Sequence, residues 1–99
     1  MIQFDVCPTG SGGRQLVIVL QHAHLSDLTT VVVAPLYPKA ELPPVAHLRP
    51  IVRVGRKEYV MAIDRLSAVP AKTLGVPVGN LEPSRFEISR ALDLVFAGF

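Results

Sequence analysis

The chain has 99 residues, of which 49% are hydrophobic and 18% charged, and its formal net charge is +2. This length fits one compact domain, and so high a hydrophobic share excludes a disordered chain. A charge this small is too weak to indicate nucleic-acid binding through phosphate contacts alone. Because a small domain this apolar leaves hydrophobic surface exposed, we expect it to self-associate into a homodimer.

Short strands are predicted in the first third of the chain. Residues 2–6 alternate between apolar and polar side chains, which is the period of a half-buried strand. Residues 8–13 are rich in glycine and proline and predict a loop. Apolar runs at residues 16–20 and 29–34 are typical of buried strands, and Pro35 indicates the end of the second run or a bulge in it.

The middle of the chain combines a long loop with a hairpin. Residues 35–50 contain five prolines and predict a loop with one helical turn around residues 39–42. Strands are expected at residues 51–54 and 58–63, joined by the glycine-containing residues 55–57. Beyond these strands, the chain is expected to become irregular after residue 70.

A helix is predicted at the end of the chain. Ser84 and Glu87 have the spacing of a capping box, Pro83 suits a helix entrance, and Gly98 is placed to stop the helix. One helical face carries the apolar residues Ile88, Ala91, Leu92, Val95, Phe96 and Phe99. Five short strands and a terminal helix predict a mainly β fold: one domain, residues 1–99, forming a small, partly open SH3-like barrel with a C-terminal α-helix.

Few residues suggest metal or phosphate chemistry. His22, His24 and His47 are candidate metal ligands, but no carboxylate or thiolate motif accompanies them, so surface histidines are the preferred interpretation. The glycines in residues 10–13 lead into a strand rather than a helix, and therefore predict a hairpin loop instead of a phosphate site. We expect no metal and no cofactor.

The single cysteine, Cys7, excludes an intramolecular disulfide and a thiolate metal cage. The first residues lack the basic start and apolar run of a secretory signal. The longest apolar stretch, residues 31–37, is too short to span a membrane. We therefore expect a cytoplasmic protein with no membrane contact.

Two segments are candidates for binding a macromolecule. Residues 49–65 contain five basic and two acidic residues, and a solvated hairpin face explains them most simply. The sharper alternative is an RNA groove, in which Arg53 holds a phosphate and Glu58 is the base for attack by a 2′-hydroxyl. The second segment is residues 96–99, whose aromatic side chains at the end of a helix suit an anchor for a protein partner.

The order of several short motifs over essentially the whole chain resembles the CcdB family, the toxins of CcdA–CcdB type II toxin–antitoxin systems. The motifs are Ile2-Gln3-Phe4, Pro50-Ile51-Val52-Arg53-Val54-Gly55, Ala68-Val69-Pro70 with Leu74-Gly75, and Ile88-x-x-Ala91-Leu92-x-Leu94-Val95-Phe96-Ala97-Gly98-Phe99. The resemblance implies a barrel shared with the MazF/Kid ribonuclease toxins and a symmetric homodimer. It implies a toxin that is not an enzyme, binds the A subunit of DNA gyrase while gyrase is joined to cleaved DNA, and meets DNA only indirectly. A CcdA-like antitoxin, which folds on binding, is implied to neutralise the toxin and to repress the shared operon.

The resemblance also assigns binding residues. The family pattern ends in Trp-Gly-Ile, so the gyrase-binding residues of this chain are expected at Ala97, Gly98 and Phe99, of which only the glycine is identical. Before the helix, where the family is polar and charged, the apolar Phe86 with Arg85 and Glu87 suggests an antitoxin contact. The alternatives are a MazF/Kid-like endoribonuclease on the same barrel, and a non-toxic homologue that still binds antitoxin.

Overall fold

A computed structural model of the chain describes residues 2–22 and 29–98. Within them one antiparallel sheet is formed by β1 (Asp5–Thr9), β2 (Gln15–Val19), β3 (Thr30–Pro38), β4 (Ile51–Val54), β5 (Lys57–Met61), β6 (Ser67–Pro70) and β7 (Gly79–Asn80). The α-helix α1 (Arg85–Ala97) follows the last strand. Short 3-10 turns lie at Ser11–Gly13 (η1), Ile63–Arg65 (η3), Ala71–Thr73 (η4) and Glu82–Ser84 (η5).

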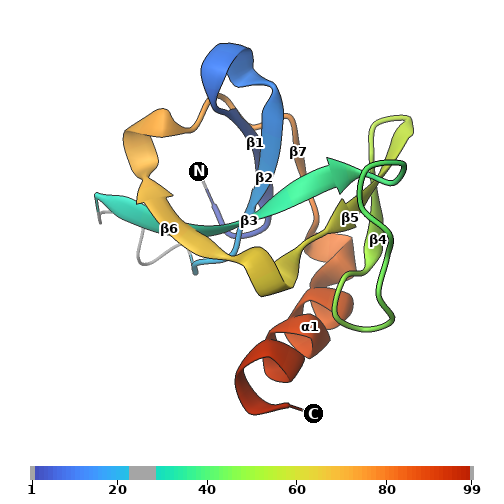
Figure 1. Cartoon of the computed structure of the whole chain (residues 1–99). Helices are drawn as coiled ribbons and strands as arrows, with labels where there is room; N and C mark the ends of the chain where they lie inside the picture. The colour runs from blue at the N-terminus through green and yellow to red at the C-terminus, as the bar shows by residue number, and fades with distance from the viewer. Residues whose placement is uncertain (1, 23–28, 99) are drawn as a thin grey trace.

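The sheet curls into a nearly closed barrel. Its strands follow the order β4-β5-β3-β2-β1-β7, and β6 pairs with the first half of β3. The two end strands of this path, β4 and β7, approach each other, because a Cβ placed on Gly79 would lie 3.9 Å from Cγ1 of Val54. Helix α1 follows β7, and its C-terminal part projects away from the barrel (Figure 1). The predicted mainly β, SH3-like barrel with a C-terminal helix is confirmed.

Two apolar clusters explain why the central strands are continuous hydrophobic runs. The main cluster fills the barrel and includes Ile18 and Met61, together with Ile88 and Ala91 of α1. A second cluster lies on the other face of β1, β2 and β3, and contains Cys7, Val17, Val19, Val31 and Val33. A strand that is covered on both faces carries apolar residues at successive positions. This explains the continuous apolar run at residues 16–20.

The first strand begins later than predicted. The expected strand at residues 2–6 is replaced by a turn followed by β1, which runs on to Thr9. The turn is fixed by the amide of Ile2, which donates to Asp5 Oδ2 at 2.8 Å, and by Phe4, which has a φ of 71° and is buried. The alternation in the sequence therefore arises from a buried turn residue beside a strand, not from one continuous strand.

The strand predicted to end or bulge at Pro35 continues to Pro38. The amide of Leu20 donates to the carbonyl of Val32, so this pair of residues in β2 and β3 is hydrogen bonded. Bonded and non-bonded pairs alternate along an antiparallel ladder, which makes Pro35 and Val17 a non-bonded pair. The missing amide hydrogen of Pro35 therefore costs no hydrogen bond to β2. On its other side Pro35 accepts a bond from the amide of Ala62, just beyond the end of β5. Only one ladder bond is lost at the proline, so the strand passes through it.

The predicted hairpin is confirmed, with a tighter turn and a shorter second strand, because β5 ends at Met61 and Ile63 begins η3. Val54 pairs with Lys57, so the turn has two residues and Gly55 occupies its first position with a φ of 62°. The turn predicted near residues 39–42 is present, since the amide of Glu41 donates to the carbonyl of Pro38. Strands β6 and β7 lie outside the predicted elements.

The predicted C-terminal helix is confirmed. Gly98 stops it in the left-handed conformation with a φ of 78°, and its amide donates to the carbonyl of Leu94 at 3.1 Å. The capping-box prediction is wrong in its geometry, because the Ser84 side chain makes no capping hydrogen bond. Turn η5 leads directly into α1, and Ser84 is its last residue. The amide of Ser84 donates to the carbonyl of Leu81, so the chain is already in a helical turn before α1 begins. No helix in the described residues is long and apolar enough to cross a membrane.

Candidate functional site

Helix α1 carries both sets of predicted binding residues at its opposite ends. Residues 85–87 form its first turn, and Ala97 and Gly98 form its end, about 18 Å away at a rise of 1.5 Å per residue. Ile88 and Ala91 face the barrel core between them. Phe99, the third predicted gyrase contact, lies outside the described residues. The helix thus separates two candidate contact surfaces by about its own length.

The first turn of α1 presents a single large apolar side chain. Phe86 is 84% exposed. Its neighbour Arg85 turns back onto the chain, with its guanidinium 5.9 Å from the centre of the Phe4 ring and its Nε 3.5 Å from Oε1 of Glu82. Glu87 is exposed. Of the three residues predicted to contact antitoxin, Phe86 is therefore the one whose side chain offers apolar surface to a partner.

The end of α1 forms a second exposed surface, here called the terminal patch and made of Phe96, Ala97 and Gly98. All three residues are exposed, and Phe96 has 74% of its surface in solvent. Although Phe96 shares the apolar helical face of Ile88 and Ala91 in the sequence pattern, its ring is exposed, as a terminal anchor at residues 96–99 requires. The last turn lies beyond the barrel wall, so no strand covers it (Figure 1). An exposed aromatic ring thus stands directly before the two described positions that the family pattern marks.

Two arginines of the basic segment at residues 49–65 make contacts within the chain. Arg49 is held by Asp64 in a bidentate ion pair, with Nε–Oδ1 and Nη2–Oδ2 distances of 3.0 and 2.8 Å. The guanidinium of Arg65 lies 5.5 Å from the centre of the Tyr37 ring. The Arg49 pair thus joins the end of the long loop to η3, and the Arg65 contact joins η3 to β3.

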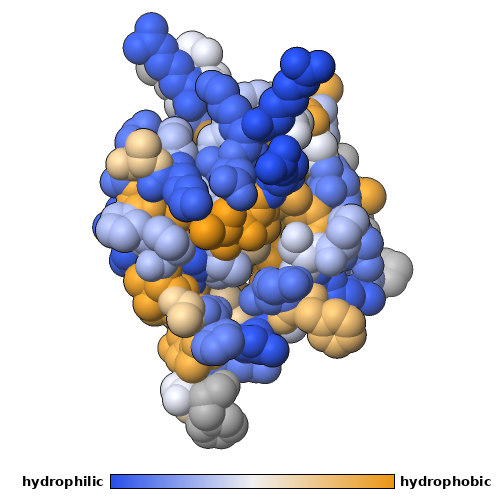
Figure 2. All heavy atoms as spheres, turned by 90° about the vertical axis from the view of Figure 1, so that its right-hand side faces the viewer, coloured by the Kyte–Doolittle hydropathy of each residue, from blue (hydrophilic) through white to orange (hydrophobic). Residues whose placement is uncertain are grey.

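The remaining cations surround the β4–β5 hairpin. Arg53 lies directly opposite Glu58 in the strand register, and both are exposed. The carboxylate of Glu58 is 3.9 Å from Nζ of Lys39. Arg56 lies in the turn itself. Figure 2 shows this side of the molecule, with hydrophilic side chains projecting at the top and hydrophobic residues gathered below them. The register thus brings together the two residues predicted for RNA chemistry, Arg53 and Glu58.

The ion pair at Asp64 makes a pH-dependent contribution to stability. The hydrogen bond from Arg49 is the main reason that the pKa of Asp64 lies below its ordinary value. A carboxyl with a lowered pKa stabilises the fold above its unfolded pKa, and this contribution is lost as the pH falls through the folded pKa. Asp64→Asn should therefore be less stable than the parent at pH 7, and the difference should vanish in acid.

Urea unfolding of both proteins from pH 7 to pH 2.5 measures this difference. Asp93→Asn, which removes an exposed carboxylate on α1, is the matched control and should not show the pH dependence. A stability difference between Asp64→Asn and the parent that stays constant down to pH 2.5 would contradict the assignment to the ion pair.

The residues considered for metal or phosphate binding lie in different segments: His22 follows β2, His47 lies in the long loop before β4, and residues 10–13 lie between β1 and β2. In residues 2–22 and 29–98 no three His, Cys, Asp or Glu side chains are grouped so as to hold a metal ion. His24 lies outside the described residues. His47 has its Nδ1 2.8 Å from Nη1 of Arg90, and since arginine only donates, the ring nitrogen accepts and links the long loop to α1. Residues 10–13 join β1 to β2, which confirms the predicted hairpin loop.

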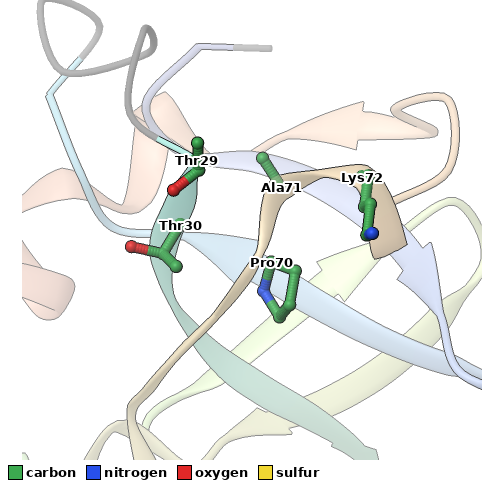
Figure 3. Close-up of a pocket in the computed structure, with 5 residues that line it drawn as sticks. All are labelled: Thr29, Thr30, Pro70, Ala71 and Lys72. Atoms are coloured by element: carbon green, nitrogen blue, oxygen red, sulfur yellow. The ribbon is translucent and has the colours of Figure 1, made fainter.

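Sequence reasoning missed one open hollow of about 570 Å³. It lies where β3 begins and β6 ends, and Figure 3 shows its lining residues, Thr29, Thr30, Pro70, Ala71 and Lys72. The amide of Ala71 already donates to the carbonyl of Thr29, and the carbonyl of Pro70 accepts from Oγ1 of Thr73. Among its described lining residues, Lys72 carries the one titratable side chain. No pattern in the sequence marked it, because β6 itself was not predicted.

Solved structures that share this fold include three toxins. The Mycobacterium tuberculosis toxin MazF-mt6 has a TM-score of 0.78 and 18% identity, with 93% of this chain and 95% of that chain covered. An endoribonuclease in complex with its cognate antitoxin, from a mycobacterial species, has a TM-score of 0.76 and 18% identity, with 96% and 93% covered. A further M. tuberculosis toxin has a TM-score of 0.77 and 20% identity, with 92% and 99% covered.

The sequence comparisons assign the family. No curated protein matches the chain. The family described as CcdB protein matches residues 3–98, which is nearly the whole chain and includes every strand, α1 and two of the three terminal positions. The chain belongs to the CcdB family.

Proposed function

We propose that this chain is the toxin of a CcdA–CcdB type toxin–antitoxin pair, and that it acts as a homodimer by binding the A subunit of DNA gyrase. The observation that carries the proposal is the family match over residues 3–98. The exposure of the terminal patch, to which the resemblance assigns target binding, supports it. A two-fold dimer would present two terminal patches to a two-fold target.

The chemistry of the terminal patch suits binding rather than catalysis. Its described side chains are an aromatic ring at Phe96 and a methyl group at Ala97, and neither can move a proton or attack a substrate. An exposed aromatic residue at the end of a projecting helix is an effective anchor, because it buries a large area at little cost in side-chain entropy. The proposed action is therefore to hold gyrase, not to modify it.

The test is to mix purified protein with gyrase and supercoiled plasmid. The expected product is linear DNA with gyrase covalently attached. Absence of this product at micromolar protein would contradict gyrase poisoning. Induced expression with and without a co-expressed antitoxin tests toxicity separately: unaffected growth together with antitoxin binding would identify a non-toxic homologue.

Antitoxin binding is proposed to depend on the first turn of α1. Phe86→Ala should weaken antitoxin binding about thirtyfold, because truncating an exposed aromatic anchor typically costs about 2 kcal/mol at an interface. Isothermal titration with the antitoxin measures the loss. Phe96→Ala, the same substitution at the other end of the helix, is the matched control. Equal losses from both variants would contradict an antitoxin contact centred on Phe86.

The alternative function is RNA cleavage on the same barrel. It is favoured by the placement of Arg53 opposite Glu58 and by the likeness of the fold to toxins described as MazF and as an endoribonuclease. Incubation with a long RNA tests it. Specific cleavage that is lost in Arg53→Ala would support this function in place of gyrase binding.

A further inference from the structure

The gap at which the barrel closes, between β4 and β7, is here called the seam, and it lies outside both contact surfaces proposed on α1. These strands are the two ends of the sheet path, and within the described residues no strand pairs with the outer edge of β4. Strand β7 has only two residues against four in β4, and the chain then turns into η5 and α1. The barrel therefore leaves part of a strand edge open.

The hydrogen-bond pattern shows which backbone groups face this seam. The amide of Met61 donates to the carbonyl of Pro50, so the pair 50–61 is hydrogen bonded. In an antiparallel ladder bonded pairs alternate, and the register then makes 52–59 and 54–57 the next bonded pairs. The amide and carbonyl groups of Ile51 and Arg53 consequently point away from β5, toward the seam.

The other edge of β5 gives an independent check. The amide of Lys39, directly after β3, donates to the carbonyl of Glu58, so Glu58 directs its backbone groups toward β3 and not toward Arg53. No hydrogen bond from the backbone of Ile51 or Arg53 to another described residue accompanies this pattern. Two donors and two acceptors of β4 are thus available at the seam.

The surroundings of the seam indicate what it would bind. An open pocket of about 140 Å³ lies in it, large enough for one short side chain. It is lined by Arg53, Val54, Gly55, Val78, Gly79, Asn80, Leu81 and Val6. Val78 is 59% exposed and Ile51 is 40% exposed, so apolar side chains flank both strands. The β4–β5 hairpin beside them carries three cations, Arg53, Arg56 and Lys57, and one carboxylate, Glu58. On the β7 side, the carboxylate of Asp5 accepts a hydrogen bond from Asn80 at 3.0 Å.

We propose that this seam binds an extended, acidic peptide segment of a partner protein. The segment lies along β4 and exchanges backbone hydrogen bonds with Ile51 and Arg53, as in other cases of strand addition to an open edge. Its apolar side chains contact Val78 and Ile51, with one of them in the pocket. Its carboxylates face the hairpin cations, which selects acidic over basic segments. The lining of the seam contains neither Phe86 nor a residue of the terminal patch, so the proposal does not depend on the proposed function.

The test uses the acetylated and amidated peptide (Glu-Val)₃ with the intact protein. At a peptide concentration of about ten times Kd, amide exchange at Ile51 and Arg53 should slow about tenfold. The amides of Val52 and Val54, already bonded to β5, are internal references and should change little. Arg53→Glu with Lys57→Glu should weaken binding about tenfold. Arg14→Glu with Lys72→Glu, which reverses two exposed cations elsewhere, is the matched control.

Two control peptides separate backbone pairing from other contacts. A (Glu-Val)₃ peptide with alternate backbone amides methylated should not bind, and (Lys-Val)₃ should bind more weakly. The proposal is overturned if Ile51 and Arg53 gain no protection at saturation, or if the methylated peptide binds as well as the parent. Protection that rises with protein concentration in the absence of peptide would overturn it in favour of a second copy of the chain at this edge.

Discussion

Replacing Ala97 with tryptophan should strengthen binding to the A subunit of gyrase by about a thousandfold. An aromatic anchor that fills a pocket at an interface commonly contributes about 2 kcal/mol. Two such anchors per dimer give about 4 kcal/mol, which corresponds to about three powers of ten in affinity. Position 97 is exposed at the end of α1, so the larger side chain meets no neighbour in the barrel. Titration of the variant and the parent in the plasmid cleavage assay measures the gain.

The same substitution elsewhere on the helix provides the control. Ser89 is exposed on α1, and Ser89→Trp adds an equal aromatic surface away from the terminal patch. It should leave gyrase binding unchanged. If Ala97→Trp binds no better than the parent, the end of α1 is not where this chain contacts gyrase. If both variants gain equally, the effect is nonspecific adhesion of tryptophan.

The parts of the fold that were predictable are those in which local pattern and tertiary packing agree. The hairpin at residues 51–61 combines alternating burial in β4 with a glycine at the one turn position that has a positive φ. Strand β6 was not predictable, because Ser67 and Ala68 are exposed and only Val69 contacts a core cluster. The strand exists because β3 presents an edge there, and sequence periodicity does not report that.

The candidate site likewise contains features that the sequence pattern predicts and features that it does not. Exposure at Phe86 follows from its position on the helix away from Ile88 and Ala91, and helical spacing is sufficient to see it. The packing of Arg85 on Phe4 joins residues from opposite ends of the chain, and the open edge at Ile51 and Arg53 depends on how the barrel closes. Features created by closure have no local signature in the sequence.

Both proposed contact surfaces on α1 depend on the attachment of the helix to the barrel. A helix of 13 residues is marginal in water on its own, so its position is set by the residues that it buries. Ile88 and Ala91 are the fully buried ones, both with 0% exposure. The barrel thus holds Phe86 and the terminal patch in fixed positions through these two side chains.

Ile88→Ala should therefore lower the free energy of unfolding by about 3 kcal/mol, the middle of the range for truncating a buried isoleucine. Urea unfolding measures the loss as a lower midpoint at unchanged slope. Ser89→Ala, at the exposed neighbouring position, should change stability little. A loss below about 1 kcal/mol for Ile88→Ala would mean that α1 is not packed at this point. Because the helix carries both surfaces, warming Ile88→Ala toward its unfolding midpoint should weaken antitoxin binding and gyrase binding together. By contrast, Phe86→Ala should weaken antitoxin binding alone, and Phe96→Ala should weaken gyrase binding alone.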